Sequence, residues 1–264
     1  MTSSKRRSKS KDHATVDAGK VYAYGTHALN EALEHAPHAV RKAFLAPNAG
    51  TKQMRALLAQ HKIPISELSN VRGAELVGRD AVHQGVIAVI DPSALFTPLG
   101  ELLDKLELSK NPALAVLGEV QDPHNVGAVI RSAAAFGLSG VLIPEHNQAR
   151  ITGTVLKTSA GMAFRMPLVS INNVNTVLAR LKERGFWIYG LSADGNVPLT
   201  EEAFTAPAVF VVGNEGRGIR EKTLAACDIS LSIAMHQRTE SLNAAVSASV
   251  AFYAWSAKHP EWLA

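Results

Sequence analysis

The sequence has a single cysteine and no long run of apolar residues. Cys227, alone among 264 residues, can form neither an internal disulfide nor a cysteine-cluster metal site, so it is expected to be a small core residue in a reducing, cytoplasmic environment. No stretch reaches the roughly 18 consecutive apolar residues of a membrane-spanning helix. The basic N-terminus is not followed by the apolar segment of a signal peptide. These absences predict a soluble protein that makes no membrane contact.

Positive charge is concentrated at one end of the chain. Residues 1–20 contain six basic and two acidic residues, which accounts for the whole net charge of +4. A Ser/Lys/Arg-rich segment without apolar periodicity is predicted to be a disordered arm. It is interpreted either as a solubility tail or as a basic arm that contacts the phosphates of a nucleic acid.

Apolar residues make up 47% of the chain, which is enough for one large or two smaller hydrophobic cores. The mixed pattern of residues 21–92 predicts a small α/β domain. Residues 93–112 place one amphipathic helix among prolines and are interpreted as a linker. The elements expected in the small domain are helices at 27–33 and 51–61 and strands at 42–46 and 85–90.

From residue 113 to residue 264, apolar strands alternate with helical segments. This alternation predicts an α/β fold with a parallel sheet that helices cover on both faces. Ligands bind such sheets at the carboxyl ends of the strands, and three loops expected there have unusual chemistry. The expected strands are 114–120, 140–144, 165–171, 186–192, 208–213 and 229–234.

The first loop and its helix read GEVQDPHNVGAVIRSAAAFG, residues 118–137. Asn125 is interpreted either as the cap of a helix that starts near Val126 or as a residue of a site. Arg131 follows within that helix, among small apolar residues. Because an arginine is rarely buried without a partner, these neighbours indicate that a second helix or a ligand packs closely there.

The second loop, VVGNEGRGIRE at residues 211–221, is rich in glycine. Its glycines do not fit the G-x-G-x-x-G pattern and no Gly-Lys-Ser/Thr follows, which disfavours a Rossmann-type nucleotide enzyme. Glu215 at its centre would repel a phosphate. The loop is interpreted either as a site for a cationic or hydroxyl-bearing ligand or as a solvent-facing turn.

The third loop precedes a helix that is apolar on nearly every face, in RTESLNAAVSASVAFYAW at residues 238–255. Ser241 is expected to cap this helix and Asn243 to lie in its first turn. Capping does not account for all the polar residues of this loop, and their surplus indicates that the loop belongs to a functional site. A helix that is apolar all round is not expected to face water, so its second side is predicted to pack on another subunit.

Three segments, DPHNVGAVIRSAAAFG, VVGNEGRGI and SIAMHQRTESLNAAVSAS, resemble in this order and spacing the three motifs of the SpoU/TrmH branch of the SPOUT RNA methyltransferases. Within residues 21–92, YGTHALNEALEHA and HQGVIAVI resemble the L30e-like substrate-binding domain of ribosomal RNA ribose methyltransferases. The resemblance implies a small L30e-like domain followed by a parallel-sheet SPOUT domain at residues 113–264, with a C-terminal trefoil knot. It also implies a homodimer.

The resemblance further implies S-adenosylmethionine as the cofactor and no metal. Two departures from the family pattern, Ala234 and Ala244–Ala245, leave the polar positions intact. By position, Asn125, Arg131, Glu215, Ser241 and Asn243 match the catalytic set, and Gly213, Ile233 and Leu242 match positions that hold the cofactor.

The implied reaction suits these residue types. A ribose 2′-hydroxyl is a weak nucleophile, so its methylation needs alignment and a charge that favours the alkoxide. Arg131 stays protonated and is expected to bind the hydroxyl and the adjacent phosphate, with Glu215 holding Arg131 or a hydroxyl. The expected function is RNA 2′-O-ribose methylation, of a 23S-type guanosine in ribosomal RNA ahead of transfer RNA. The alternative is a catalytically inactive RNA-binding factor for ribosome assembly.

Overall fold

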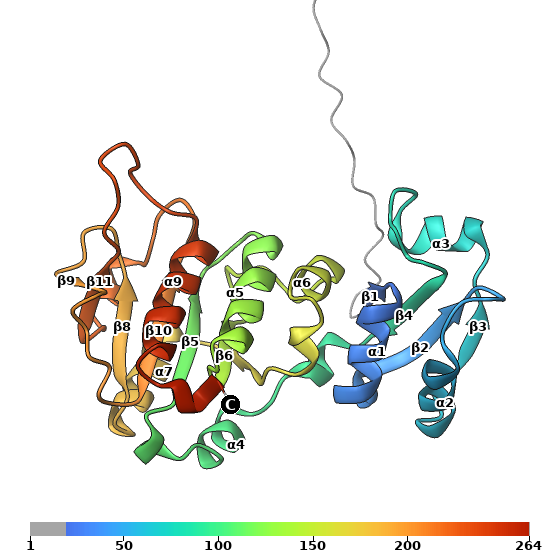
Figure 1. Ribbon diagram of the computed structural model, residues 1–264, viewed down its shortest axis with the longest axis horizontal. Coiled ribbons are helices and arrows are strands. Elements are labelled where there is room, and N and C mark those ends of the chain that lie inside the picture. Colours follow the sequence, from blue (N-terminus) through green and yellow to red (C-terminus); the bar gives the residue numbers. More distant parts are fainter. Residues whose placement is uncertain (1–19, 264) are drawn as a thin grey trace, which may run out of the picture.

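The structure, a computed structural model, describes residues 20–263. The predicted basic arm, residues 1–20, therefore lies outside the described residues except for Lys20. Two β-sheets lie side by side, each with its own helices (Figure 1). Within residues 20–263 no helix is both long and apolar enough to span a membrane.

The first sheet has four strands in the order β1-β4-β2-β3. It is mixed, because β4 is antiparallel to both of its neighbours whereas β3 is parallel to β2. Leu33 and Leu58, from two of the helices, belong to one apolar core, and Leu76 packs with Phe44 and Ile87 in another. The elements are β1 (Val21–Tyr24), α1 (Thr26–His35), η1 (Pro37–Ala39), β2 (Val40–Leu45), α2 (Lys52–Gln60), β3 (Ile65–Glu67), α3 (Asn70–Val77) and β4 (Val86–Ile90).

The second sheet has seven strands in the order β7-β6-β5-β10-β8-β11-β9, and every strand pair in it is parallel. The predicted α/β fold with a parallel sheet is therefore confirmed. Its elements are β5 (Ala113–Gly118), α5 (Pro123–Ala135), β6 (Gly140–Pro144), α6 (Gly153–Thr158), η4 (Met162–Phe164), β7 (Leu168–Ile171), α7 (Val174–Glu183), β8 (Trp187–Leu191), β9 (Val197–Pro198), β10 (Ala208–Gly213), α8 (Glu221–Leu224), β11 (Ile229–Ser232), α9 (Ala244–Ser256) and η5 (Pro260–Leu263).

Helices cover both faces of the seven-stranded sheet, as the buried apolar strands require. Successive side chains of a strand point to opposite faces. Ala115 and Leu117 of β5 belong to one core together with residues of α5 and α9. Leu114 and Val116 belong to the other core, which includes residues of α7. The central strands are thus shielded from water, and their polar chemistry is confined to the loops at their ends.

Three strands of the larger sheet differ from their predicted ranges by two or more residues at one end. The strand predicted at 114–120 ends at Gly118, because Glu119 adopts a left-handed conformation with φ 68° that cannot continue a strand. The strand predicted at 165–171 begins at Leu168, because the chain before it forms the short helix η4 and Arg165 turns away to pair with Glu31. The strand predicted at 229–234 ends at Ser232.

The predicted linker, residues 93–112, is packed against the larger sheet. It contains α4 (Leu99–Asp104), the one helix expected there, flanked by the short helices η2 (Pro92–Leu95) and η3 (Leu108–Lys110). Leu102 and Leu103 of α4 are buried in the core that α7 covers. The segment is therefore part of the larger domain's core as well as a connection.

Candidate functional site

Loops at the carboxyl ends of β8, β10 and β11 enclose a cavity of about 310 Å³. This is the edge of the sheet at which ligands of parallel sheets bind. All three residues that match cofactor positions, Gly213, Ile233 and Leu242, line the cavity. Glu215 and Ser241 line it as well.

Gly213 is required by the shape of the loop that follows β10. A side chain at this position would overlap the backbone of Gly218, where the loop folds back. Asn214 and Gly218 exchange two backbone hydrogen bonds of 2.9 Å, and the Asn214 side chain accepts from the N–H groups of Gly216 and Arg217. These two N–H groups are already bonded within the loop, which disfavours a phosphate cradle of the kind that glycine-rich loops form.

Glu215 is the acceptor that joins this loop to the one after β5. Its carboxylate accepts hydrogen bonds from the backbone N–H groups of Gln121 and Asp122, at 3.2 and 3.1 Å, and from the Asn125 side chain at 2.9 Å. Burial alone would raise the pKa of Glu215, but the hydrogen bonds from Asn125 and the backbone outweigh it and hold that pKa below its usual value. Glu215 is therefore ionised at neutral pH.

Asn125 is buried, with 7% of its surface exposed. It is not the cap of its helix, as one interpretation of the sequence had it. The cap is Asp122, whose side chain accepts from the N–H of His124 at 2.8 Å, and Pro123 occupies the first helical position. The Asn125 amide is left free to donate to Glu215 and to accept from the Asn243 side chain at 2.9 Å.

Asn243 caps the last helix, and the prediction that Ser241 does so is wrong. The Asn243 side chain accepts from the N–H groups of Ala245 and Val246, at 2.9 and 3.3 Å, while its amide donates to Asn125. Ser241 is exposed on the wall of the cavity. The three loops thus converge through one chain of hydrogen bonds, Glu215 to Asn125 to Asn243.

Arg131 does not join this network. It lies in the third turn of α5 and is exposed, and no ion pair or hydrogen bond joins its side chain to another residue in the described part of the chain. Glu215 was expected to hold Arg131 or a hydroxyl. Within a single chain it does not bond to Arg131, because its carboxylate is held by Asn125 and the backbone. Arg131 also does not line the cavity at the ends of β8, β10 and β11.

The last helix, α9, is not fully buried within one chain. It packs against α5, where Ser132 and Ser249 form a hydrogen bond of 2.7 Å (Figure 1). Val246, Val250 and Tyr253 are 47%, 36% and 61% exposed. These side chains form an apolar strip on the outer surface of the helix.

Sequence reasoning missed part of the cavity wall. The turn after β8, from Leu191 to Asp194, lines it, and so does Met235. The available signal was that residues 186–192 were predicted as a strand of the parallel sheet, whose carboxyl end belongs at the ligand edge. Asn214 was also missed; its amide donates to the Glu119 backbone at 2.9 Å and so ties the loop to the end of β5.

Cys227 is half-buried at the edge of the core around α7 and α8, near its predicted place. Burial raises the pKa of its thiol to about 11, so the thiol is protonated at neutral pH. Among residues 20–263 no cluster of His, Cys, Asp or Glu is arranged to hold a metal ion.

Two family models match this sequence, one over each of its two sheets. Residues 112–253 match the model of the SpoU rRNA Methylase family, and residues 22–96 match the model described as RNA 2'-O ribose methyltransferase substrate binding. Two relatives are 23S rRNA (guanosine-2'-O-)-methyltransferases RlmB. The one from Pseudomonas putida is 32% identical over 87% of this chain and 93% of that protein. The one from Pseudomonas syringae pv. tomato is 34% identical over 87% and 92%.

The fold is also that of a solved structure. The SpoU methyltransferase AviRb from Streptomyces viridochromogenes, in complex with AdoMet, superposes with a TM-score of 0.78 over 91% of both chains. The two sequences are 24% identical, so this likeness concerns the architecture.

Proposed function

The chain belongs to the SpoU rRNA methylase family, and we propose that it transfers a methyl group from S-adenosylmethionine to the ribose 2′-hydroxyl of a guanosine in 23S ribosomal RNA. The observation that carries this proposal is the hydrogen-bond network of Glu215, Asn125 and Asn243, which joins the loops around the cavity. The choice of substrate follows the relatives that match over most of the chain.

The cavity at the ends of β8, β10 and β11 suits S-adenosylmethionine. Apolar side chains such as Leu224, Leu231 and Ile233 line it beside exposed backbone from the loop after β10, a combination that fits an adenine ring and its polar edge. The Glu215 carboxylate at its rim adds negative charge, which favours a cationic ligand. When bound, S-adenosylmethionine supplies an electrophilic methyl group on a sulfonium ion.

The protein's own residues align the ribose 2′-hydroxyl and stabilise the negative charge on its oxygen. Asn125 and Asn243 are fixed by their mutual hydrogen bond, so they keep the loops around the cavity in place. The Arg131 guanidinium binds the ribose hydroxyl and the neighbouring phosphate, and it stabilises the negative charge that grows on the oxygen as the hydroxyl proton passes to water. Ser241, exposed on the cavity wall, orients the ribose.

The working unit is a homodimer with shared sites. Two observations support this part of the proposal: the apolar strip of Val246, Val250 and Tyr253 on α9, and the exposure of Arg131 on the adjacent helix. Pairing of these surfaces through a two-fold axis would bury the strip and bring Arg131 of one subunit to the Gly213 loop of the other. We also propose that the C-terminal part of the sheet is threaded as a trefoil knot, as the family resemblance implies.

Nucleoside mass spectrometry of 23S ribosomal RNA from a strain lacking the gene tests the proposed function. One 2′-O-methylguanosine is expected to be absent, to return with the wild-type gene, and to stay absent with the Arg131→Ala gene. If all 2′-O-methyl marks persist in the deletion strain, the proposed substrate is wrong.

A further inference from the structure

A second cavity, of about 200 Å³, lies where the two domains meet. Tyr24, His27 and Gln84 line it from the small domain, and Gly153 and Lys157 line it from the larger one. None of these residues belongs to the site around Gly213. No local sequence pattern predicts this cavity, because its two walls come from segments more than 60 residues apart.

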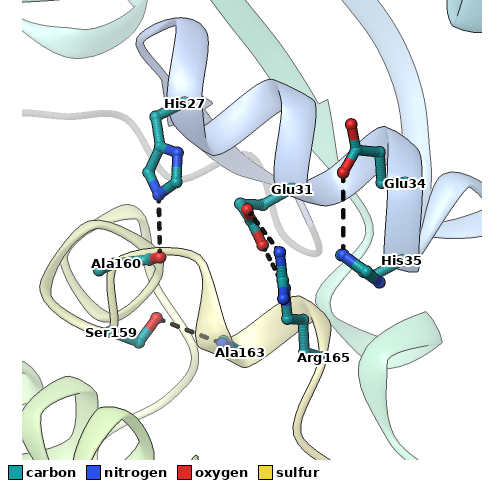
Figure 2. Close-up of polar contacts among 8 residues, drawn as sticks. All are labelled: His27, Glu31, Glu34, His35, Ser159, Ala160, Ala163 and Arg165. Atoms are coloured by element: carbon teal, nitrogen blue, oxygen red, sulfur yellow. Dashed lines mark hydrogen bonds and ion pairs between the residues drawn. The ribbon is translucent and has the colours of Figure 1, made fainter. Parts of the chain in front are cut away.

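The two walls are held together by specific contacts. Glu31 of α1 is almost fully buried, and its carboxylate accepts two hydrogen bonds from the Arg165 guanidinium, at 2.6 and 2.9 Å (Figure 2). Beside it, His27 Nε2 lies 3.3 Å from the carbonyl oxygen of Ala160. Gly161 lies directly against Glu31, where a side chain would collide with the Glu31 stem. The walls of the cavity are therefore held in place by close packing and hydrogen bonds between the two domains.

The lining combines a cation, an aromatic ring and an apolar rim. Lys157 Nζ lies 5.3 Å from the centre of the Tyr24 ring, and Val82, which is 74% exposed, lines the opening. Gln84 accepts from the Thr26 N–H at 3.2 Å, which fixes its amide at the wall. No carboxylate lines the cavity among the residues that the structure describes. Nucleic-acid sites that hold an unpaired nucleotide use the same combination of a basic group and an aromatic surface.

The cavity lies beside the helix that carries Arg131. Figure 1 shows α5 and α6 between α9 and β1, and α6 contacts both α5 and β1. Gly127 of α5 packs on Thr158 of α6, and Arg131 lies one turn further along the same side of α5. Packed helices lie about 8–10 Å apart, so an RNA strand at Arg131 can reach the cavity by crossing the single helix α6.

We propose that the cavity between the domains binds one unpaired nucleotide of the substrate RNA, a few positions from the methylated ribose. Lys157 contacts its phosphate, and its base lies against Val82 and the edge of Tyr24. Both domains then hold the same RNA strand, and the Glu31–Arg165 pair fixes the spacing between this nucleotide and the methylated one. This inference rests on the proposed function and adds a second contact point to it.

The test is Val82→Glu in the full chain, with Val82→Gln as the neutral control. Because Val82 is exposed, both variants are expected to keep the melting temperature and the affinity for S-adenosylmethionine. Filter binding to an unmethylated 23S ribosomal RNA transcript is expected to show about a tenfold higher Kd for Val82→Glu, since a carboxylate in the opening repels a phosphate. Val82→Gln is expected to raise the Kd less, because it removes the apolar contact with the base without adding charge. Lys157→Ala is expected to weaken binding similarly, whereas Lys105→Ala is not, because Lys105 is an exposed residue at the C-cap of α4, on the opposite face of the larger sheet from α6.

Ultraviolet cross-linking adds a direct readout, in which RNA is expected on the peptide that contains Tyr24. The cavity does not bind RNA if Val82→Glu and Lys157→Ala bind the transcript as the wild type does, or if Lys105→Ala weakens binding as much as Lys157→Ala. Methylation of the same transcript by the wild type is scored separately. A wild type that binds the transcript but does not methylate it would contradict the proposed function, and the comparison of binding by the variants would still decide the role of the cavity.

Discussion

Asn125 donates a hydrogen bond of 2.9 Å to Glu215 and thereby joins two loops that are 90 residues apart in sequence. The same side chain accepts from Asn243, 118 residues away. Loss of any one member leaves another polar group without its partner, which costs more than the hydrogen bond itself contributes. The network is therefore expected to behave as one unit that holds the cavity loops in place.

Glu215→Gln is expected to lower the melting temperature at neutral pH by about 2–4 °C, the effect of about 1 kcal/mol in a chain of this size. The folded-state pKa of Glu215 lies below its unfolded value near 4.5, so the stability that the carboxylate contributes is fully present above that value and is lost as the pH falls through the folded-state pKa. Calorimetry across this range should show the two proteins converging in acid. A difference that does not depend on pH would contradict the role of the charge.

Asn243→Ala and Ser241→Ala form a matched pair. Asn243 caps α9 and bonds to Asn125, so its removal is expected to cost about 1–2 kcal/mol of unfolding free energy. Ser241 is exposed and makes no capping bond, so Ser241→Ala is expected to leave stability unchanged and to lower methylation only. Denaturant unfolding measures both variants. Equal destabilisation of the two would show that the capping assignment is wrong.

Arg131→Ala is expected to lower turnover by about 10²–10³, the usual loss when one charge-stabilising group is removed. Because Arg131 is exposed in the chain, folding and the affinity for S-adenosylmethionine are expected to be unchanged. Arg180→Ala, at an exposed position on α7, is the control and should retain full activity. A variant that loses its dimeric state but keeps its activity per folded molecule would make Arg131 an interface residue.

Mixed dimers test whether sites are shared between subunits. Gly213→Val disables the cofactor loop, since any side chain there meets the Gly218 backbone. Subunits carrying this change are mixed with Arg131→Ala subunits, each inactive alone. If Arg131 serves the other subunit's cavity, heterodimers recover up to about half of the wild-type activity, because one of their two sites is intact. Confirmed exchange without recovery would show that each site lies within one chain.

The sequence was sufficient to predict the parallel sheet, since the strands of this sheet are apolar runs separated by helical segments. It was less reliable where neighbouring residues compete for one role. Asp122 and Asn125 both suit a helix cap, as do Ser241 and Asn243, and the choice depends on contacts with distant loops. The Asp-Pro pair at 122–123 was a usable signal for the first cap. No local pattern marked Asn243, which is fixed by its bond to Asn125.

Contacts between domains were beyond sequence reasoning. Glu31 lies on an amphipathic helix, where a charged residue normally faces water, and Arg165 was placed in a strand. Their pairing depends on how two separately folded sheets dock, and local periodicity carries no information on that. Arg131 shows the converse case: the small residues around it were interpreted correctly as a packing surface, but the arginine itself is exposed.

Methylation by the purified chain tests the central claim most directly. The protein is incubated with S-adenosylmethionine carrying a deuterated methyl group and an unmethylated 23S ribosomal RNA transcript, and the digested nucleosides are analysed by mass spectrometry. The expected product is 2′-O-methylguanosine with the deuterated methyl on the ribose, formed by the wild type and nearly abolished by Arg131→Ala. A label on a base, or no label in RNA that the protein binds, would contradict the account.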